Sequence, residues 1–326
     1  MTVQRWAAIG AGTISRSVVP DLQSCGGAEV VVVQSRDAAK AAAFAEEFGI
    51  PASTGDYDAV LADPGIDAIY LATPFATHHA MTRAALLAGK HVLVEKPMTM
   101  NAAEAADLFA LAAERGLFLM EAMWMKFSPV FVRLQEELAN GTIGEPRNLR
   151  ATFGIPFPNT DGASSKWDVA RSGGALLDQG IYPITLAHSV FGEPVSVHAA
   201  GTVRDDGLDV AEHFTLEYAD GRYAQCASSM SEFAELTASV GGPTGWLTLT
   251  PPFWATTDLE VHAGGMRQIF RTPDLVEFPR EGSGYVPMLR AVIAAIAEGT
   301  TEHPVHTAAD TLAVFRTIDE IFAQIR

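Results

Sequence analysis

One lysine of this sequence stands where a sheet would present it to a ligand. Lys96 comes directly after the aliphatic run 92–94 and lies between Glu95 and Pro97. A run of this kind predicts a buried strand, and an open parallel sheet binds its ligands beyond the carboxyl ends of the strands. Lys96 is therefore predicted to face a bound molecule, with Pro97 fixing the backbone after it. The alternative is an ordinary strand exit with a solvated lysine.

A glycine-rich turn near the N-terminus is suited to bind a pyrophosphate. The apolar residues 6–9 are followed by Gly10-Ala11-Gly12-Thr13-Ile14 and then by a helical pattern, which is the context of a dinucleotide fingerprint. Gly10 permits the tight turn, Gly12 allows close approach, and the helix N-terminus at Thr13 and Ile14 favours negative charge. The third glycine is replaced by Ser15. The alternative is a plain glycine turn.

The tip of the next predicted strand, 29–34, distinguishes between two cofactors. It is followed by Ser35 and Arg36, where an NAD site usually carries an acidic residue. A hydroxyl and a guanidinium suit a 2′-phosphate, which favours NADP over NAD. Asp37 then serves as the N-cap of the following helix. In the alternative, Arg36 is solvated and Asp37 binds the ribose of NAD.

Further cofactor contacts are predicted beyond the later strands of the same sheet. The candidates, besides Lys96, are Thr73, Pro74, His78, Glu95 and Trp124. His78 and His79 are adjacent, so on a helix they face different directions and do not form a metal pair. His303 and His306 have a metal-like spacing but stand in a polar loop without cysteine or carboxylate support, so no metal site is predicted.

Length, charge and cysteine content limit the class of protein. The 326 residues suffice for two domains, and 48% hydrophobic with 19% charged residues describes a globular protein with a sizeable core. A net charge of −17 argues against nucleic acid and anionic membranes as partners. The two distant cysteines suggest neither a disulfide framework nor a zinc site, and we expect a cytoplasmic protein without signal peptide or membrane span.

The hydrophobic pattern changes along the chain, which predicts two domains. Strands alternating with helices up to about residue 122 predict an α/β fold with a doubly wound parallel sheet, a Rossmann domain covering 1–122. In 195–203 and 210–218 apolar and polar residues alternate, and further strands are expected at 222–230, 236–241, 245–249, 258–262 and 266–271. Such alternation predicts an open, mainly antiparallel sheet in an α+β domain covering 123–326. Its C-terminal helix is expected near 307–325 and could pack back on the first domain.

Three motifs together resemble the glucose–fructose oxidoreductase / inositol dehydrogenase (Gfo/Idh/MocA) family. They are Gly10-Ala11-Gly12, then Glu95-Lys96-Pro97, then the run 173–182, which contains Asp178, Gly180 and Tyr182. Tyrosine at 182, together with Ser35-Arg36 and the run 120–124, is similar to the dimeric dihydrodiol dehydrogenase and NADP-dependent D-xylose dehydrogenase branch. The resemblance covers the whole chain. It implies that Lys96, Asp178 and Tyr182 surround the substrate carbinol, and that the outer face of the second sheet pairs protomers into a homodimer or homotetramer.

The implied lysine and tyrosine are chemically suited to work together. A phenol has an ordinary pKa of about 10, and a nearby ammonium favours the phenolate. Lys96 beside Tyr182 would therefore form an acid/base unit, and which of the two carries the proton stays open. Asp178, four residues before Tyr182, would share its helix face and either bind a substrate hydroxyl or position the lysine. In the alternative, both residues are purely structural: Tyr182 is a core residue and Asp178 caps a helix at the surface.

The predicted function is an oxidoreductase that transfers hydride between NAD(P) and a secondary alcohol or carbonyl group. The resemblance implies a small sugar, a cyclic polyol or a trans-dihydrodiol as substrate. Two alternatives are transient use of the cofactor for glycoside elimination or hydrolysis, and a non-catalytic cofactor-binding regulator. The candidate substrate walls are Trp124, Phe153, Trp167, Asp168 and Trp254.

Overall fold

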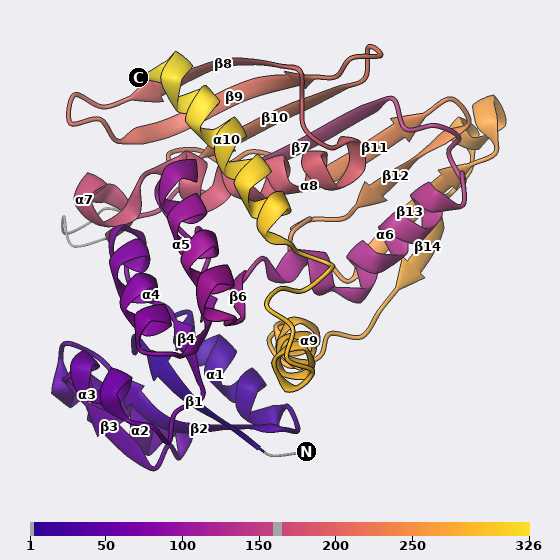
Figure 1. The fold of residues 1–326 in the computed structure, drawn as a ribbon. Helices are drawn as coiled ribbons and strands as arrows, with labels where there is room; N and C mark the ends of the chain where they lie inside the picture. Colours follow the sequence, from indigo (N-terminus) through magenta and orange to yellow (C-terminus); the bar gives the residue numbers. More distant parts are fainter. Residues whose placement is uncertain (1–2, 159–164) are drawn as a thin grey trace. The chain divides into compact units, whose positions relative to one another are not determined.

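The computed structural model describes residues 3–158 and 165–326, and the chain divides into two compact units. Unit 1 contains the residues up to Phe127 together with Arg280–Thr311, and unit 2 contains Ser128–Pro279 together with Leu312–Arg326. Figure 1 shows the course of the chain from the N-terminal strands to the C-terminal helix. The domain boundary that the sequence predicts after residue 122 remains a prediction.

Unit 1 is built on a six-stranded parallel sheet, as predicted for a Rossmann fold. The strands lie in the order β3-β2-β1-β4-β5-β6, and every pair is parallel. Since parallel strands end at one edge, this sheet brings the residues that follow each strand to the same side. The strands are β1 (Gln4–Ile9), β2 (Ala28–Gln34), β3 (Ala52–Thr54), β4 (Ala68–Leu71), β5 (His91–Val94) and β6 (Leu119–Glu121).

Three helices of unit 1, α2, α3 and α5, begin at a capping side chain. Asp37 accepts hydrogen bonds from the backbone of Ala39 and Lys40 at the start of α2, and Asn101 accepts one from Glu104 at the start of α5. Both helices end at a glycine with positive φ, Gly49 and Gly116. The helices are α1 (Ser15–Ser24), α2 (Ala38–Phe48), α3 (Tyr57–Ala62), α4 (His78–Leu87), α5 (Ala102–Arg115) and α9 (Val286–Ala297), with single 3-10 turns at Phe75–Thr77 and Trp124–Phe127.

Unit 2 carries an eight-stranded sheet, mainly antiparallel as predicted. Its strand order is β14-β13-β12-β11-β7-β10-β9-β8, and only the central β7 and β10 run parallel. Along β9 the inward side chains Val210, Glu212, Phe214 and Leu216 are buried. The strands are β7 (Asn148–Gly154), β8 (Ser196–Val203), β9 (Asp209–Glu217), β10 (Tyr223–Ser229), β11 (Ala238–Gly242), β12 (Gly245–Leu249), β13 (Asp258–Ala263) and β14 (Asp274–Glu277).

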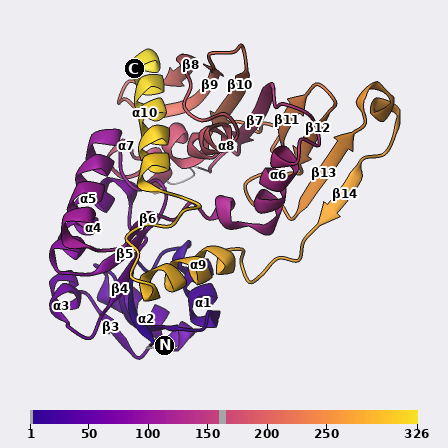
Figure 2. The same cartoon turned by 45° about the vertical axis from the view of Figure 1, so that its right-hand side comes forward.

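Helices cover one face of the unit 2 sheet. Helix α8 (Ile181–Phe191) packs beneath β7 and β10, and α6 (Pro129–Ala139) packs against β13 (Figure 2). A π-helical turn, Leu176–Gly180, leads directly into α8. Short helical turns lie at Ser165–Trp167 and, in α7, at Val169–Ser172. Helix α10 (Ala308–Ile325) starts in unit 1, and its later turns belong to unit 2, where Gln324 bonds the backbone of β8.

One expectation about an individual strand was wrong. Residues 266–271 do not form a strand: Gly264 and Gly265 have φ of +116° and +74°, and the chain continues as a 3-10 helix, Gly265–Phe270. Met266 and Phe270 are 84% and 83% exposed, so their apolar character does not mark a core position. The strands β3, β7 and β14 were not predicted, although Leu149, Ala151 and Phe153 of β7 alternate and are buried.

None of the helices in the described residues combines the length and the apolar character that crossing a membrane would require.

Candidate active site

The turn after β1 has the geometry of a phosphate-binding loop. Gly10 has φ of +105°, and a Cβ there would lie 2.3 Å from the carbonyl oxygen of Ala72, so only glycine fits. At Gly12 a Cβ would meet nothing within 4 Å, and Gly12 and Thr13 are exposed. Helix α1 begins without a side-chain cap, and the positive end of its dipole lies at this turn. These residues fit the pyrophosphate of a dinucleotide.

The serine in place of the third glycine has its own structural role. Ser15 is fully buried, and its hydroxyl donates a hydrogen bond of 2.6 Å to the carbonyl oxygen of Gly10. The side chain therefore closes the turn that the first glycine opens. The departure from the glycine pattern leaves the loop intact.

The residues that follow β2 include the two candidates for contact with the cofactor ribose or its 2′-phosphate, Arg36 and Asp37. The Asp37 carboxylate is occupied as the cap of α2, with Oδ1 3.1 Å from the nitrogens of Ala39 and Lys40. Arg36 is exposed and forms no hydrogen bond or ion pair with the residues the structure describes. Ser35 accepts a hydrogen bond from the Asp37 backbone at 3.3 Å. A guanidinium is therefore accessible at the strand tip, beside a carboxylate that is already engaged.

The exit of β4 is tied to the segment that carries Lys96. His78 is fully buried, with Nδ1 2.8 Å from the Pro97 carbonyl oxygen and Nε2 2.8 Å from that of Thr73. Burial lowers the pKa of His78, against the raising effect of both carbonyl contacts. Thr77 contacts Thr73 Oγ1 and the Pro74 carbonyl, each at 2.7 Å. His78 thus joins two loops through its ring, and Thr73 and Pro74 form the turn beside it.

Buried groups hold the residues on both sides of Lys96. The Tyr70 hydroxyl donates to Glu95 at 2.8 Å, and Glu121 accepts from the backbone N–H of Met98 at 2.8 Å. The ammonium of Lys96 lies 5.9 Å from the centre of the Phe75 ring, within range of a cation–π interaction. The Lys96–Pro97 peptide bond is cis. Lys96 is half-buried, so its side chain remains partly accessible on a firmly held backbone.

Trp124 belongs to the interior of unit 1. It is 7% exposed, and its ring centre lies 4.8 Å from that of Tyr285. Gly284 has φ of +107°, and a Cβ there would lie 3.1 Å from the Trp124 ring. The structure thus places this residue in a packed environment, and its contact with cofactor or substrate stays a prediction.

Unit 2 gathers three of the predicted residues into one aromatic cluster. Phe153 of β7 and Trp254 stack with ring centres 3.4 Å apart and planes 7° from parallel. The Tyr182 ring of α8 lies 5.7 Å from Phe153 and 6.1 Å from Trp254. Tyr182 is 4% exposed. The cluster gives the candidate catalytic tyrosine a rigid apolar wall.

Asp178 lies in the π-helical turn before Tyr182 and pairs with a lysine. The partner is Lys166, whose ammonium also lies 4.3 Å from the Phe157 ring centre. Asp178 is 7% exposed, so the alternative that it caps a helix at the surface does not apply. Trp167 donates its indole N–H to the Phe157 carbonyl at 2.9 Å, and Asp168 caps α7. Both of these predicted wall residues therefore have structural partners.

Sequence reasoning missed the acidic residues beneath this turn. Asp209 accepts from the backbone N–H of Leu176 at 2.7 Å and pairs with Arg326, and Glu212 bonds Ser228. Burial raises the pKa of Asp209, while the Leu176 N–H and Arg326 lower it. Burial, reinforced by Asp209, raises the pKa of Glu212 well above its ordinary range. The alternating pattern of β9 marked position 212 as inward-facing, which was the available signal.

His303 and His306 do not share a site. His303 packs against Phe127 with ring centres 5.1 Å apart, and His306 bonds Glu121. Within residues 3–158 and 165–326, no group of three or more histidine, cysteine or acidic side chains converges to hold a metal.

Both halves of the chain match models of one protein family. Residues 4–123 match the model described as "Oxidoreductase family, NAD-binding Rossmann fold", and residues 131–248 match the "GFO/IDH/MocA C-terminal domain".

Similar proteins are known by sequence and by structure. The trans-1,2-dihydrobenzene-1,2-diol dehydrogenase of Mus musculus is 34% identical over 97% of this chain and 95% of its own. That of Bos taurus is 38% identical over 79% of this chain and 77% of its own. Among solved structures, a 3-ketoreductase from Actinomadura kijaniata in complex with NADP and TDP-benzene is 31% identical, with a TM-score of 0.89 over 100% of this chain and 98% of that one.

Proposed function

This chain belongs to the Gfo/Idh/MocA oxidoreductase family, and from that premise we propose that it transfers hydride between NADP and a secondary alcohol or carbonyl group. The proposed substrates are a sugar, a cyclic polyol or a trans-dihydrodiol. One observation carries the proposal: Lys96 is presented at the carboxyl end of β5, in a Rossmann sheet whose phosphate-binding loop is complete.

Lys96 and Tyr182 are proposed to transfer the proton of the substrate hydroxyl. A bound nicotinamide supplies the hydride chemistry. Tyr182 holds or releases the proton of the substrate hydroxyl, and the Lys96 ammonium favours the phenolate when the two serve the same substrate. The Phe153–Trp254 stack keeps the Tyr182 ring in place and limits access of water. Asp178, which pairs with Lys166, binds a further substrate hydroxyl.

NADP is proposed over NAD because of the exit of β2. The Asp37 carboxylate is occupied by the α2 N-terminus, whereas the Arg36 guanidinium is exposed. A guanidinium binds a phosphate through two parallel hydrogen bonds, which the ribose hydroxyl of NAD does not offer. The A. kijaniata 3-ketoreductase structure, which contains NADP, supports the same choice.

The outer face of the unit 2 sheet is proposed to pair with a second copy of the chain. The outward side chains of β7, β10 and β12 are mostly uncharged, among them Thr152, Gln225 and Thr248, with Arg150 as a charged exception. We expect light scattering at micromolar protein to give the mass of a dimer or tetramer. A monomeric mass would contradict this part of the proposal. We also propose a cytoplasmic location, because Cys25 and Cys226 are both unpaired and buried.

A substrate panel tests the function. Sugars, cyclic polyols and trans-dihydrodiols would be offered with NADP and with NAD, and the nicotinamide absorbance followed in both directions. We expect net reduction of NADP by at least one diol or sugar. Product formation without net absorbance change would indicate transient use of the cofactor, and cofactor binding without turnover on the whole panel would indicate a regulator; either result would overturn the proposal.

A further inference from the structure

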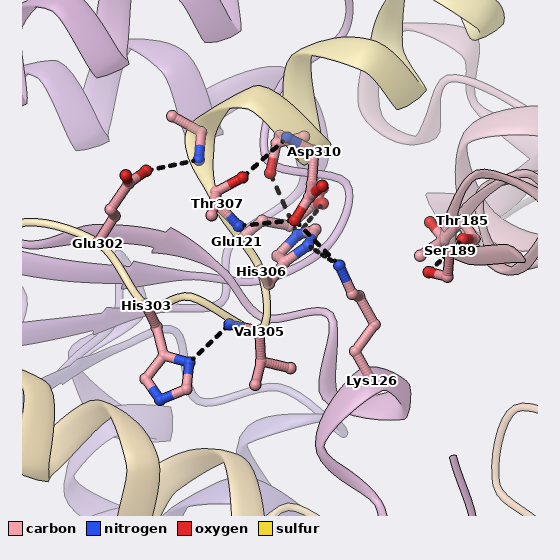
Figure 3. A network of polar contacts seen from close by, with 12 residues as sticks. Glu121, Lys126, Thr185, Ser189, Glu302, His303, Val305, His306, Thr307 and Asp310 are labelled. Atoms are coloured by element: carbon pink, nitrogen blue, oxygen red, sulfur yellow. Dashed lines mark hydrogen bonds and ion pairs between the residues drawn. The ribbon is translucent and has the colours of Figure 1, made fainter. Parts of the chain in front are cut away.

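We propose that Glu121 is a positioning residue for Lys96, and that His306 and Lys126 hold Glu121 in the state that this requires. The inference rests on the proposed role of Lys96 in proton transfer. All the residues involved belong to unit 1, and Figure 3 shows Glu121, Lys126, His306 and Asp310 among them.

The first contact joins the end of one strand to the loop of its neighbour. Glu121 is the last residue of β6, which pairs with β5, and its Oε1 accepts a hydrogen bond of 2.8 Å from the Met98 N–H. Met98 is fully buried and Glu121 is 1% exposed. Met98 stands two residues after Lys96, so this bond fixes the backbone on which the lysine is carried. The bond is buried, so losing it would leave an unsatisfied N–H.

The second oxygen of the same carboxylate faces His306. Oε2 of Glu121 lies 3.2 Å from Nε2 of His306, and both side chains are 1% exposed. Thr311 Oγ1 lies 3.1 Å from the same ring nitrogen. Glu121 is therefore held between the Lys96 segment on one side and the loop before α10 on the other.

Lys126 determines which nitrogen of His306 carries the proton. Its ammonium lies 3.5 Å from Nδ1 and 3.1 Å from Oδ2 of Asp310. Burial lowers the pKa of Lys126, and the Asp310 carboxylate opposes that fall. An ammonium has only donors, so Nδ1 must accept and the proton must reside on Nε2. A doubly protonated ring would place two positive charges side by side. In the proposed arrangement the Nε2–H of His306 donates to Glu121, and Figure 3 shows the contacts that His306 makes with Glu121 and Lys126.

This arrangement requires two acceptor atoms at position 121. A carboxylate supplies them, because it accepts both from Met98 and from His306. In Glu121→Gln, an amide oxygen that accepts from Met98 leaves the NH₂ group facing the Nε2–H of His306, donor against donor. His306 cannot relieve this by moving its proton to Nδ1, because Nδ1 then faces the Lys126 ammonium. Removing that ammonium would free the ring to change tautomer.

The argument predicts a rescue by a second substitution. We expect Glu121→Gln to lower kcat by roughly 10- to 100-fold, the scale of a slight misplacement of a catalytic group, while NADP affinity changes less than threefold. We expect Glu121→Gln/Lys126→Met to recover most of the lost kcat, although Lys126→Met alone gains nothing. Glu302→Gln is the matched control: Glu302 is an exposed acid of the same loop that accepts from the Ala308 N–H, and its amide can do the same.

Nitrogen-15 NMR of histidine-labelled protein provides the measurement that does not depend on activity. In the wild type, the shifts of His306 should show a protonated Nε2 and a bare Nδ1, and in the double variant the reverse. A His306→Gln spectrum identifies the signals.

Failure of the inference and failure of the proposed function give different results. Absence of turnover by the wild type on the substrate panel would refute the function, and the NMR result would still test the tautomer. If Glu121→Gln keeps wild-type kcat, or if the double variant is no better than the single one, the positioning role is wrong. A protonated Nδ1 in the wild type would overturn the assignment of Lys126. Matched melting temperatures of the single and double variants would exclude recovered folding as the cause of a rescue.

Discussion

The Tyr70 hydroxyl donates a hydrogen bond of 2.8 Å to Glu95, and both side chains are buried in the unit 1 sheet. Burial raises the pKa of Glu95 from its ordinary value of 4.5 to about 7, although the Tyr70 hydroxyl and the Lys96 ammonium lower it. Burial, with the charge of Glu95, also raises the pKa of Tyr70, so the phenol stays protonated as a donor. A carboxyl group adjacent to Lys96 in the chain therefore titrates near neutral pH.

This carboxyl group makes stability depend on pH in a defined direction. Between about pH 4.5 and 7 the folded protein binds a proton at Glu95 that the unfolded chain has lost, so this residue's contribution falls as pH rises. The contribution is at most roughly 3 kcal/mol across the window. In Glu95→Gln this component is absent, and we expect the variant to gain stability relative to wild type as pH rises from 5 to 8.

The measurement is urea unfolding of wild type and Glu95→Gln at several pH values. The difference between the two proteins isolates Glu95 from other buried acids such as Glu212, whose pKa is also raised by burial. A difference that stays constant with pH, or that changes in the opposite sense, would refute the assigned shift.

His78 offers a test of how the Lys96 segment is held. The carbonyl of Pro97 is buried, whereas Thr73 is partly exposed and can bond water, so we expect the single N–H of a neutral ring on Nδ1, facing Pro97. An asparagine amide can replace that donor, and a glutamine amide replaces the Nε2 position. We therefore expect His78→Asn to keep most of the turnover and His78→Gln to lose roughly 10-fold or more.

The comparison requires a control at the neighbouring histidine. His79 is partly exposed and pairs with Asp107 at 2.9 Å, so His79→Gln should leave turnover unchanged. Equal losses in the two His78 variants, or a larger loss in His78→Asn, would show that the Pro97 contact does not position Lys96.

Cofactor choice is predicted to depend on Arg36. Arg36→Ala should weaken NADP binding by roughly 10- to 100-fold, the value of one or two charge-assisted hydrogen bonds, and leave NAD binding nearly unchanged. Lys40→Ala, which removes an exposed cation from the same helix region, is the matched control. Calorimetric titration of both cofactors gives the answer, and an equal fall in both affinities would rule out a 2′-phosphate contact.

The parallel sheet was predictable because its signals are local. Aliphatic runs ending at Gly10, Ser35, Thr73 and Glu95 each mark a strand whose exit faces the ligand, and the strand order then brings these exits together. The cap role of Asp37 was predictable for the same reason. The run 266–271 was wrongly predicted as a strand, because its apolar side chains include exposed ones and a pair of glycines turns the chain before them.

The contacts between residues far apart in the chain could not be predicted from the sequence. Trp254 stacks on Phe153, about a hundred residues earlier, and Glu121 bonds His306, 185 residues later. Nothing in local periodicity specifies such partners. Glu121 carried the same signal as Lys96, a charged residue at the carboxyl end of an apolar strand, so its importance could have been inferred even though its partner could not.

The central claim is that Lys96 and Tyr182 act as one proton-transfer unit, and turnover of Lys96→Met, Tyr182→Phe and the double variant on a confirmed substrate tests it most directly. Each single variant should lose roughly 10²- to 10⁴-fold in kcat. NADP affinity should change less in Tyr182→Phe than in Lys96→Met, because only the lysine belongs to the nucleotide-binding unit. The double variant should be little worse than either single one, because removing one member already disables the unit. Near-wild-type turnover of Tyr182→Phe, or losses that multiply in the double variant, would contradict the claim.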